Sequence, residues 1–284
     1  MKPSPFDYAK PSSLDEALGL LVSSGGNGSI LAGGQSLMPT LNMRLSSPTL
    51  LIDINGLTEL DGISVTNGML RIGSLTRHSF VEESEEIGLH VPLIAMAMPH
   101  IAHPAIRNRG TFGGSIALAD PAAELPACLC ALNGEIEIAN VNGRRKVAAA
   151  DFFKDLYETD MADDEILTAV EVPLNAEGYE SAFQELARRH GDYAMAGLAA
   201  HAKVEGNKIS DLRLAFFAVS RTPVLAKEAA AIVDGKEVTD EIISSVQDAL
   251  ESDLEPFDDL HCSAKTKMVF ARELTSRILK ALMK

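Results

Sequence analysis

The chain has 284 residues, which is enough for two domains or for one large domain with a sizeable core. Its formal net charge of −15 at pH 7 argues against nucleic acid or an anionic membrane as the main partner. No apolar run approaches the roughly 18 residues of a membrane span. The opening MKPSPFDYAKPSS has no apolar signal-peptide segment, so we expect a cytoplasmic protein without a membrane span.

The first 55 residues are expected to alternate between helices and strands. Ser13 followed by Glu16 is a capping-box pattern, and leucines at helical spacing come after it. Gly33-Gly34 is the predicted exit turn of a short buried strand. In order, a helix, a strand, a helix and a strand are expected over residues 14–21, 30–32, 37–45 and 49–54.

Two hairpins and a second group of elements follow. Asn67-Gly68 and Asn142-Gly143 each separate two apolar runs, which is typical of tight hairpin turns. We place a domain boundary near residue 176, where the pattern of strands restarts. Helices are expected over 79–86, 92–100, 239–252 and 264–283, and strands over 165–173, 181–187, 195–205 and 211–219.

The cysteines and the closest histidine pair do not indicate a metal site. Cys128 and Cys130 lie two apart in a stretch that reads as a helix, so they do not share a face. With the distant Cys262, they are expected to be buried, reduced thiols. His100 and His103 stand between prolines with no third ligand nearby, which favours structural histidines. We expect no metal ligands and no catalytic acid, base or nucleophile in this chain.

Two short segments resemble each other: LAGGQS at 31–36 and GTFGGS at 110–115. Paired glycines allow positive φ and leave backbone N–H groups uncovered, and successive uncovered N–H groups bind anions such as a pyrophosphate. Neither segment matches a dinucleotide fingerprint or a P-loop. From the residues alone, plain tight turns and an anion site remain two open interpretations.

Longer strings carry a resemblance to a known family. The chain resembles the FAD-binding medium subunit of the molybdenum hydroxylases, which include carbon monoxide dehydrogenase, xanthine dehydrogenase type enzymes and bacterial N-heterocycle dehydrogenases. The resemblance implies an α+β protein with a two-subdomain, vanillyl-alcohol-oxidase-like FAD-binding fold over 1–176, split near 55–60. A small α+β C-terminal domain would follow over 177–284. The strings are AGGQSLMPTLNMRL, LIDINGLTEL, RIGSLTRHSF, HPAIRNRGTFGGSIALADPAAELPA and ARRHGDYAMAG.

The resemblance also implies which residues bind FAD. In such subunits the two Gly-Gly turns hold the FAD pyrophosphate. The matching positions are Leu31, Ala32, Gly33, Gly34, Gln35, Ser36 and Leu37, and Gly110, Thr111, Phe112, Gly113, Gly114 and Ser115. Phe112 stands where an aliphatic residue is more usual.

Five further positions carry over from the family. Ile101 and Leu167 match apolar residues that line the flavin, and Glu124 matches an acidic cofactor contact. Tyr193 sits where relatives place a residue near the isoalloxazine, with a buried core tyrosine as the alternative interpretation. Glu185 falls close to a lysine of many relatives, and a glutamate there would not stabilise an anionic reduced flavin.

The function implied is that of an electron-transfer subunit with noncovalent FAD. A large partner subunit with the molybdenum cofactor would hydroxylate the substrate. A small partner with two [2Fe–2S] clusters would pass electrons to this FAD, and an external acceptor would receive them, in a dimer of heterotrimers. The alternatives are a nucleotide-binding regulatory or assembly subunit without a redox role, and a free-standing flavin reductase.

Overall fold

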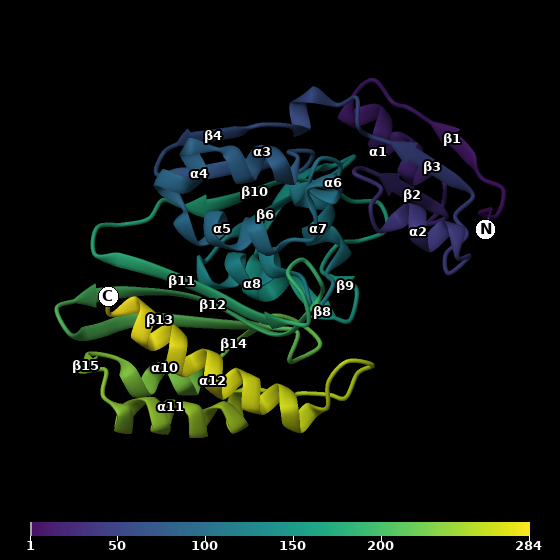
Figure 1. The fold of residues 1–284 in the computed structure, drawn as a ribbon. Helices are drawn as coiled ribbons and strands as arrows, with labels where there is room; N and C mark the ends of the chain where they lie inside the picture. Colours follow the sequence, from purple (N-terminus) through teal and green to yellow (C-terminus); the bar gives the residue numbers. More distant parts are fainter. Residues whose placement is uncertain (1) are drawn as a thin grey trace.

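The chain folds into three main sheets and one small two-stranded sheet, with helices between and around them (Figure 1). The structure is a computed structural model and describes residues 2–284. Helices and strands are mixed throughout, as the expected α+β class requires. None of the helices within residues 2–284 is long and apolar enough to cross a membrane.

The N-terminal group is a three-stranded parallel sheet with β3 in the middle. The Ser13 side chain caps the first helix by accepting a hydrogen bond from the Glu16 N–H, as the capping-box pattern predicts. Strand β1 is short and mostly exposed, so its sequence has no alternation of apolar and polar residues that would predict a strand. The elements are β1 (Asp7–Ala9), α1 (Leu14–Ser23), β2 (Gly28–Leu31), α2 (Leu37–Asn42), β3 (Leu50–Asp53) and η1 (Thr58–Leu60).

The second group is a five-stranded antiparallel sheet. Its first turn has positive φ at both Asn67 and Gly68, as a tight hairpin requires. The order β4-β5-β10-β6-β7 places a strand from late in the sequence between two hairpins. The strands are β4 (Ile63–Thr66), β5 (Met69–Gly73), β6 (Glu135–Asn140), β7 (Gly143–Ala148) and β10 (Ile166–Pro173).

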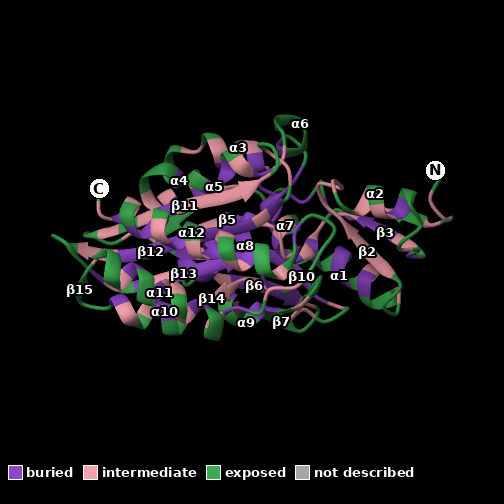
Figure 2. Ribbon diagram, turned by 60° about the horizontal axis from the view of Figure 1, so that its bottom comes forward, coloured by how far each residue is buried: buried purple, intermediate pink, exposed green. Residues whose placement is uncertain are grey.

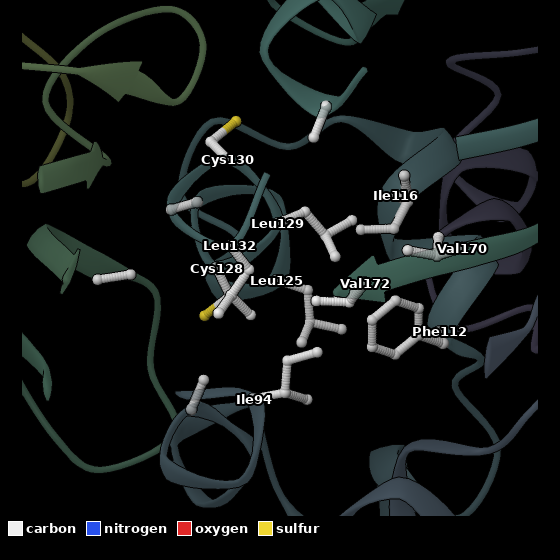
Figure 3. Packing of buried hydrophobic residues seen from close by; sticks show 14 of the residues in the cluster. Ile94, Phe112, Ile116, Leu125, Cys128, Leu129, Cys130, Leu132, Val170 and Val172 are labelled. Carbon is white, nitrogen blue, oxygen red and sulfur yellow. The ribbon is translucent and has the colours of Figure 1, made fainter. Parts of the chain in front are cut away.

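Short helices pack against this sheet and form the largest core with it (Figure 3). The helix expected over 79–86 is divided, because Ser84 ends one helix and caps the next by accepting a hydrogen bond from the Ile87 N–H. Every residue of α8 is buried. The elements are α3 (His78–Glu83), α4 (Glu85–His90), α5 (Pro92–Ala97), η2 (Met98–His100), α6 (Pro104–Arg107), α7 (Phe112–Leu118), α8 (Glu124–Ala131), α9 (Ala149–Phe152), β8 (Phe153–Asp155) and β9 (Glu158–Thr159).

The third sheet lies between two layers of helices (Figure 1), and its two middle strands are largely buried (purple in Figure 2). One face packs on α5 and α8, and the other packs on α10 and α12. Alternate residues of its strands therefore belong to different cores: Phe183 and Ala199 to one, Ala182 and Leu198 to the other. The elements are β11 (Tyr179–Ala187), β12 (Ala194–Glu205), β13 (Lys208–Phe217), β14 (Val224–Leu225), α10 (Lys227–Val233), β15 (Lys236–Glu237), α11 (Asp240–Asp253) and α12 (Ala264–Leu282).

Candidate functional site

A cavity of about 540 Å³ lies where the N-terminal sheet, α7, α8 and the segment after β11 meet. Most of the residues predicted to bind FAD line it together, although they come from distant parts of the chain. These are Ala32, Gly33, Gly34, Gln35, Ser36, Leu37, Ile101, Gly110, Thr111, Gly113, Gly114, Ser115, Glu124, Leu167 and Tyr193. A cavity of this size suits a small organic ligand or part of a larger one.

The first glycine pair lines this cavity and has free backbone donors. Within the described chain, the N–H groups of residues 33–36 donate to no acceptor. Gly34 has a φ of 71°, the left-handed conformation that favours glycine. Gly33 meets the second segment: a Cβ on it would lie 2.8 Å from the Gly110 Cα and against the Arg109 carbonyl oxygen. A turn with successive free N–H groups is the kind of backbone that can bind anions.

The second glycine pair has a different role, and the expectation of uncovered N–H groups is wrong for it. It lies in the first turn of α7, where the Gly113 N–H donates to the Ser74 carbonyl at 2.9 Å. The Gly114 N–H donates to the Thr111 hydroxyl and the Ser115 N–H to the Thr111 carbonyl. A Cβ on Gly113 would lie 2.7 Å from the Ser74 Cα. Glycine here permits close packing, and Ser115 lines the cavity.

Three of the predicted contacts do not line the cavity. Phe112 is fully buried in the core under α7 (Figure 3), where its bulk fills space. Leu31 lies between the lining residues Ile30 and Ala32, and strand alternation points it the other way. Glu185 on β11 instead pairs with His100, with 3.3 Å between its Oε1 and the histidine Nδ1.

Two buried carboxyl groups lie along one wall. Burial, reinforced by the nearby charges of Glu185 and Asp120, raises the pKa of Glu124 to about 8. Burial also raises the pKa of Asp120, which accepts a hydrogen bond from the Tyr157 hydroxyl at 3.3 Å. At neutral pH Glu124 is therefore mainly a neutral acid that can donate a hydrogen bond to a bound group.

His78 contributes to the wall near Gly110. Burial lowers the pKa of His78 to about 4, and the nearby Thr111 backbone offsets only part of this shift. No described group lies in hydrogen-bonding geometry to either ring nitrogen. A buried neutral imidazole with unpaired nitrogens fits a polar ligand in the cavity.

Tyr193, Arg107 and the three cysteines lie in three different settings. Tyr193 stands at the rim and is 65% exposed, so it is not a core tyrosine. Arg107 is buried and structural: it binds Glu82 at 2.7 Å and the Ile101 carbonyl at 2.9 Å, which fixes the Ile101 wall. The cysteines are buried and free, as expected.

Comparisons with known proteins agree across the whole chain. A family sequence model described as "FAD binding domain in molybdopterin dehydrogenase" matches residues 4–175. A second, "CO dehydrogenase flavoprotein C-terminal domain", matches residues 181–282. The chain belongs to the FAD-binding medium subunits of the molybdenum hydroxylases. Members of this family are oxidoreductase components that work within complexes of several subunits.

Individual relatives match over nearly their full length. Caffeine dehydrogenase subunit beta from a Pseudomonas species is 36% identical over 98% of this chain and 95% of the relative. The glyceraldehyde dehydrogenase medium chain of Sulfolobus acidocaldarius is 37% identical over 99% of both. A solved structure of carbon monoxide dehydrogenase from Hydrogenophaga pseudoflava, in a form lacking the Mo-pyranopterin moiety of its molybdenum cofactor, matches with a TM-score of 0.96. Its sequence is 36% identical, and the match covers 99% of this chain and 98% of the other.

The cavity of this medium subunit has the chemistry that FAD requires. The N–H groups of residues 33–36 suit a pyrophosphate, and Ile101 and Leu167 give apolar surface for a ring system. Ser115, Glu124 and His78 add polar groups inside the same cavity. The residues present therefore fit the cofactor that the family binds.

Sequence reasoning missed some of the lining of this medium subunit. His78 and Asp120 were not singled out, because neither belongs to a glycine segment. Asp120 stands in the quoted string GTFGGSIALADPAAEL, four residues before Glu124, so its place beside a predicted site residue was the available signal. His78 stands in the quoted string RIGSLTRHSF, but no predicted site residue lies beside it in the sequence. Its N–H donates to the Gly110 carbonyl at 3.1 Å, next to the pairing of Arg77 with Thr111, and this tertiary contact brings it to the cavity.

Proposed function

We propose that this chain is the electron-transfer subunit of a heterotrimeric molybdenum hydroxylase, with noncovalent FAD in the cavity. A small partner with two [2Fe–2S] clusters would supply electrons, and an external acceptor would take them up. A large partner with the molybdenum cofactor would hydroxylate the substrate, and two heterotrimers would pair. Bound FAD supplies the redox chemistry, so the residues of this chain bind, orient and shield it.

The observation that carries the proposal is the run of free N–H groups at residues 33–36, four residues that all line the cavity. We propose that it holds the pyrophosphate, with Ser115 adding a hydroxyl. Ile101, Leu167 and Tyr193 would surround the flavin ring. Phe112 and Leu31 would not touch FAD and would instead pack behind the residues that line the cavity. The proposed division remains an FAD-binding domain over 1–176 and a C-terminal domain over 177–284.

The test is to tag the chain, purify it from its native host, and measure bound flavin, iron and molybdenum. We expect FAD that is released by acid precipitation and two co-purifying subunits. Limiting dithionite should bleach both flavin and cluster absorbance, and an added acceptor should restore both. Purification without flavin would instead support the regulatory alternative. Fast reduction of the lone chain by NADH would support the free-standing reductase.

A further inference from the structure

We propose that Ser74 and His78, at the two ends of the link between β5 and α3, bind FAD through the serine hydroxyl and the imidazole ring. This role rests on the proposed function, because it takes FAD as the ligand of the cavity. None of the positions that the family resemblance assigns to FAD lies in this link. The two side chains contact the pyrophosphate of the cofactor and the hydroxyl groups next to it.

Both side chains carry buried polar atoms without partners. Ser74 is 4% exposed and His78 is 5% exposed, and both line the cavity. Among residues 2–284, six buried side-chain nitrogen or oxygen atoms have no hydrogen-bond partner, and three of them are the Ser74 Oγ and the two ring nitrogens of His78. Burying a polar group without a partner is costly, so unpaired atoms in a cavity wall point to a ligand that pairs them.

Comparable buried groups away from the cavity are paired. Thr76 belongs to the same link, but its hydroxyl accepts from the Gly62 N–H at 2.9 Å and donates to the Gly62 carbonyl at 3.1 Å. The ring of His201, another buried histidine, has its Nδ1 2.9 Å from the Ser181 hydroxyl. The unpaired state of the His78 ring therefore goes with its place in the cavity wall and is not a general feature of buried histidines in this chain.

The backbone that carries Ser74 and His78 is fixed by hydrogen bonds. The His78 N–H donates to the Gly110 carbonyl at 3.1 Å, and the Ser74 carbonyl accepts from the Gly113 N–H at 2.9 Å. The Ser74 N–H donates to the Thr168 carbonyl at 3.0 Å. Solvent barely reaches the three unpaired atoms, so the side chains turn toward FAD as it enters, and rotamer changes of this kind are common on binding.

His78 lies beside the place where the two glycine segments meet. A Cβ on Gly110 would lie 3.2 Å from the His78 Nδ1, and a Cβ on Gly33 would lie 2.8 Å from the Gly110 Cα. Ser74 adjoins the second segment, since a Cβ on Gly113 would lie 2.5 Å from the Ser74 Cβ. Because the turn at Gly33 holds the pyrophosphate in the proposed function, the phosphate groups are the part of FAD nearest to His78.

The chemistry of the two side chains matches this part of FAD. Burial lowers the pKa of His78 to about 4, so at pH 7 the ring has one N–H donor and one acceptor nitrogen. A serine hydroxyl both donates and accepts. The pyrophosphate oxygens of FAD accept hydrogen bonds, and the sugar hydroxyls next to them donate. His78 therefore donates to a phosphate oxygen, and its other nitrogen and the Ser74 hydroxyl pair with the hydroxyl groups.

The experiment compares FAD affinity with the stability of the flavin-free full chain. Ser74→Ala removes one unpaired oxygen and should weaken FAD binding about fivefold in a fluorescence titration. The Tm of the flavin-free variant should stay unchanged or rise by about 1–3 °C, because a buried group without a partner is lost. A side chain that only packs would instead lower the Tm.

Thr76→Val is the matched control in the same link, because its hydroxyl is paired and does not line the cavity. This variant should lose about 2–4 °C in Tm, since the Gly62 N–H is left without its acceptor, and should keep the FAD affinity of the wild type. The two variants thus change stability and affinity in opposite patterns.

His78→Leu provides a second measurement. It should weaken FAD binding about tenfold or more, because it removes a donor to a charged phosphate. At saturating FAD, the ³¹P NMR signals of the bound cofactor should move in His78→Leu and stay in place in Thr76→Val. Wild-type affinity and ³¹P signals in both Ser74→Ala and His78→Leu would overturn this role and leave the proposed function intact. A wild-type chain that binds no FAD would count against the proposed function itself.

Discussion

At the residue scale, the cavity depends on one position without a side chain, Gly33, and on buried polar groups that stay neutral. Gly33 has no room for a side chain because the Arg109 carbonyl and Gly110 press against it. Glu124 and His78 are kept neutral at pH 7 by burial in the same cavity. The donors and acceptors offered to FAD are therefore largely neutral groups, which is how an acidic chain can bind an anionic cofactor.

Gly33→Ala should weaken FAD binding by about tenfold or more, because overpacking typically costs about 1–3 kcal/mol and moves the turn at residues 33–36. Flavin fluorescence titration measures the affinity. Gly19→Ala is the matched control, since a Cβ at that exposed helix position meets nothing within 4 Å. Equal affinity in the two variants would contradict a binding role for this turn.

Glu124 should make stability depend on pH. Its pKa rises from 4.5 to about 8 on folding, so between these values the folded chain holds a proton that the unfolded chain has lost. Stability therefore falls as pH rises through this window, by on the order of 3 kcal/mol. Urea unfolding of the flavin-free chain at pH 5 and pH 8 should show this loss, and Glu124→Gln should reduce it. Parallel pH profiles would refute the assignment.

At the scale of elements, α12 supports the cavity from a distance. Lys267 on α12 is buried, and its Nζ donates to the Ala218 carbonyl and pairs with Asp259, both at 2.7 Å. The Ala218 N–H in turn donates to the Pro121 carbonyl, next to the cavity residue Asp120. A hydrogen-bonded chain thus connects the C-terminal helix to the wall that carries the buried acids.

Lys267→Met should lower the free energy of unfolding by about 2 kcal/mol, since it leaves the Ala218 carbonyl without its donor and Asp259 without its ion-pair partner. It should also weaken FAD binding through the displaced wall. Lys265→Met, at an exposed position of the same helix, is the control. Urea unfolding measures the first effect and flavin titration the second. A loss of stability without any change in FAD affinity would show that α12 does not support the cavity.

At the scale of the whole molecule, the cavity is completed by joining the N-terminal sheet to the rest. Arg77 carries this junction: it donates to the Asn55 side chain at 2.6 Å and to the Arg109 carbonyl. Asn55 donates in turn to the Ala32 carbonyl at 2.8 Å, at the start of the glycine turn. FAD in the cavity would touch both sides of the junction and hold them together.

FAD should therefore stabilise the whole chain. At 100 times its Kd it should add about 2.7 kcal/mol to the free energy of unfolding. This corresponds to a rise in Tm of about 5 °C in a scanning calorimeter.

Arg77→Gln should reduce FAD affinity roughly tenfold, so the same FAD concentration should give a smaller rise in Tm. Arg277→Gln, at an exposed ion pair on α12, serves as the control. If both variants respond to FAD like the wild type, the junction does not contribute to binding.

Much of the fold can be predicted from the sequence where the signal is local. The Ser13 cap, the Asn67-Gly68 turn and the two long C-terminal helices depend on neighbouring residues, and the structure has them. The break between α3 and α4 was missed because Ser84, which caps α4, lies within a run of glutamates that reads as one continuous helix. Strand β1 was missed because it is held by pairing with β3 and not by its own pattern.

The sequence by itself determined the family, the α+β class and a glycine turn suited to an anion, since motifs and periodicity are written in neighbouring residues. Only the tertiary structure decided that the two glycine pairs differ: Ser74 and Thr111 take up the N–H groups of the second pair. It also decided that Phe112 fills the core and that Glu185 meets His100. Hydrogen-bond partners and burial arise from residues distant in sequence, and they set which donors stay free and which acids keep their protons.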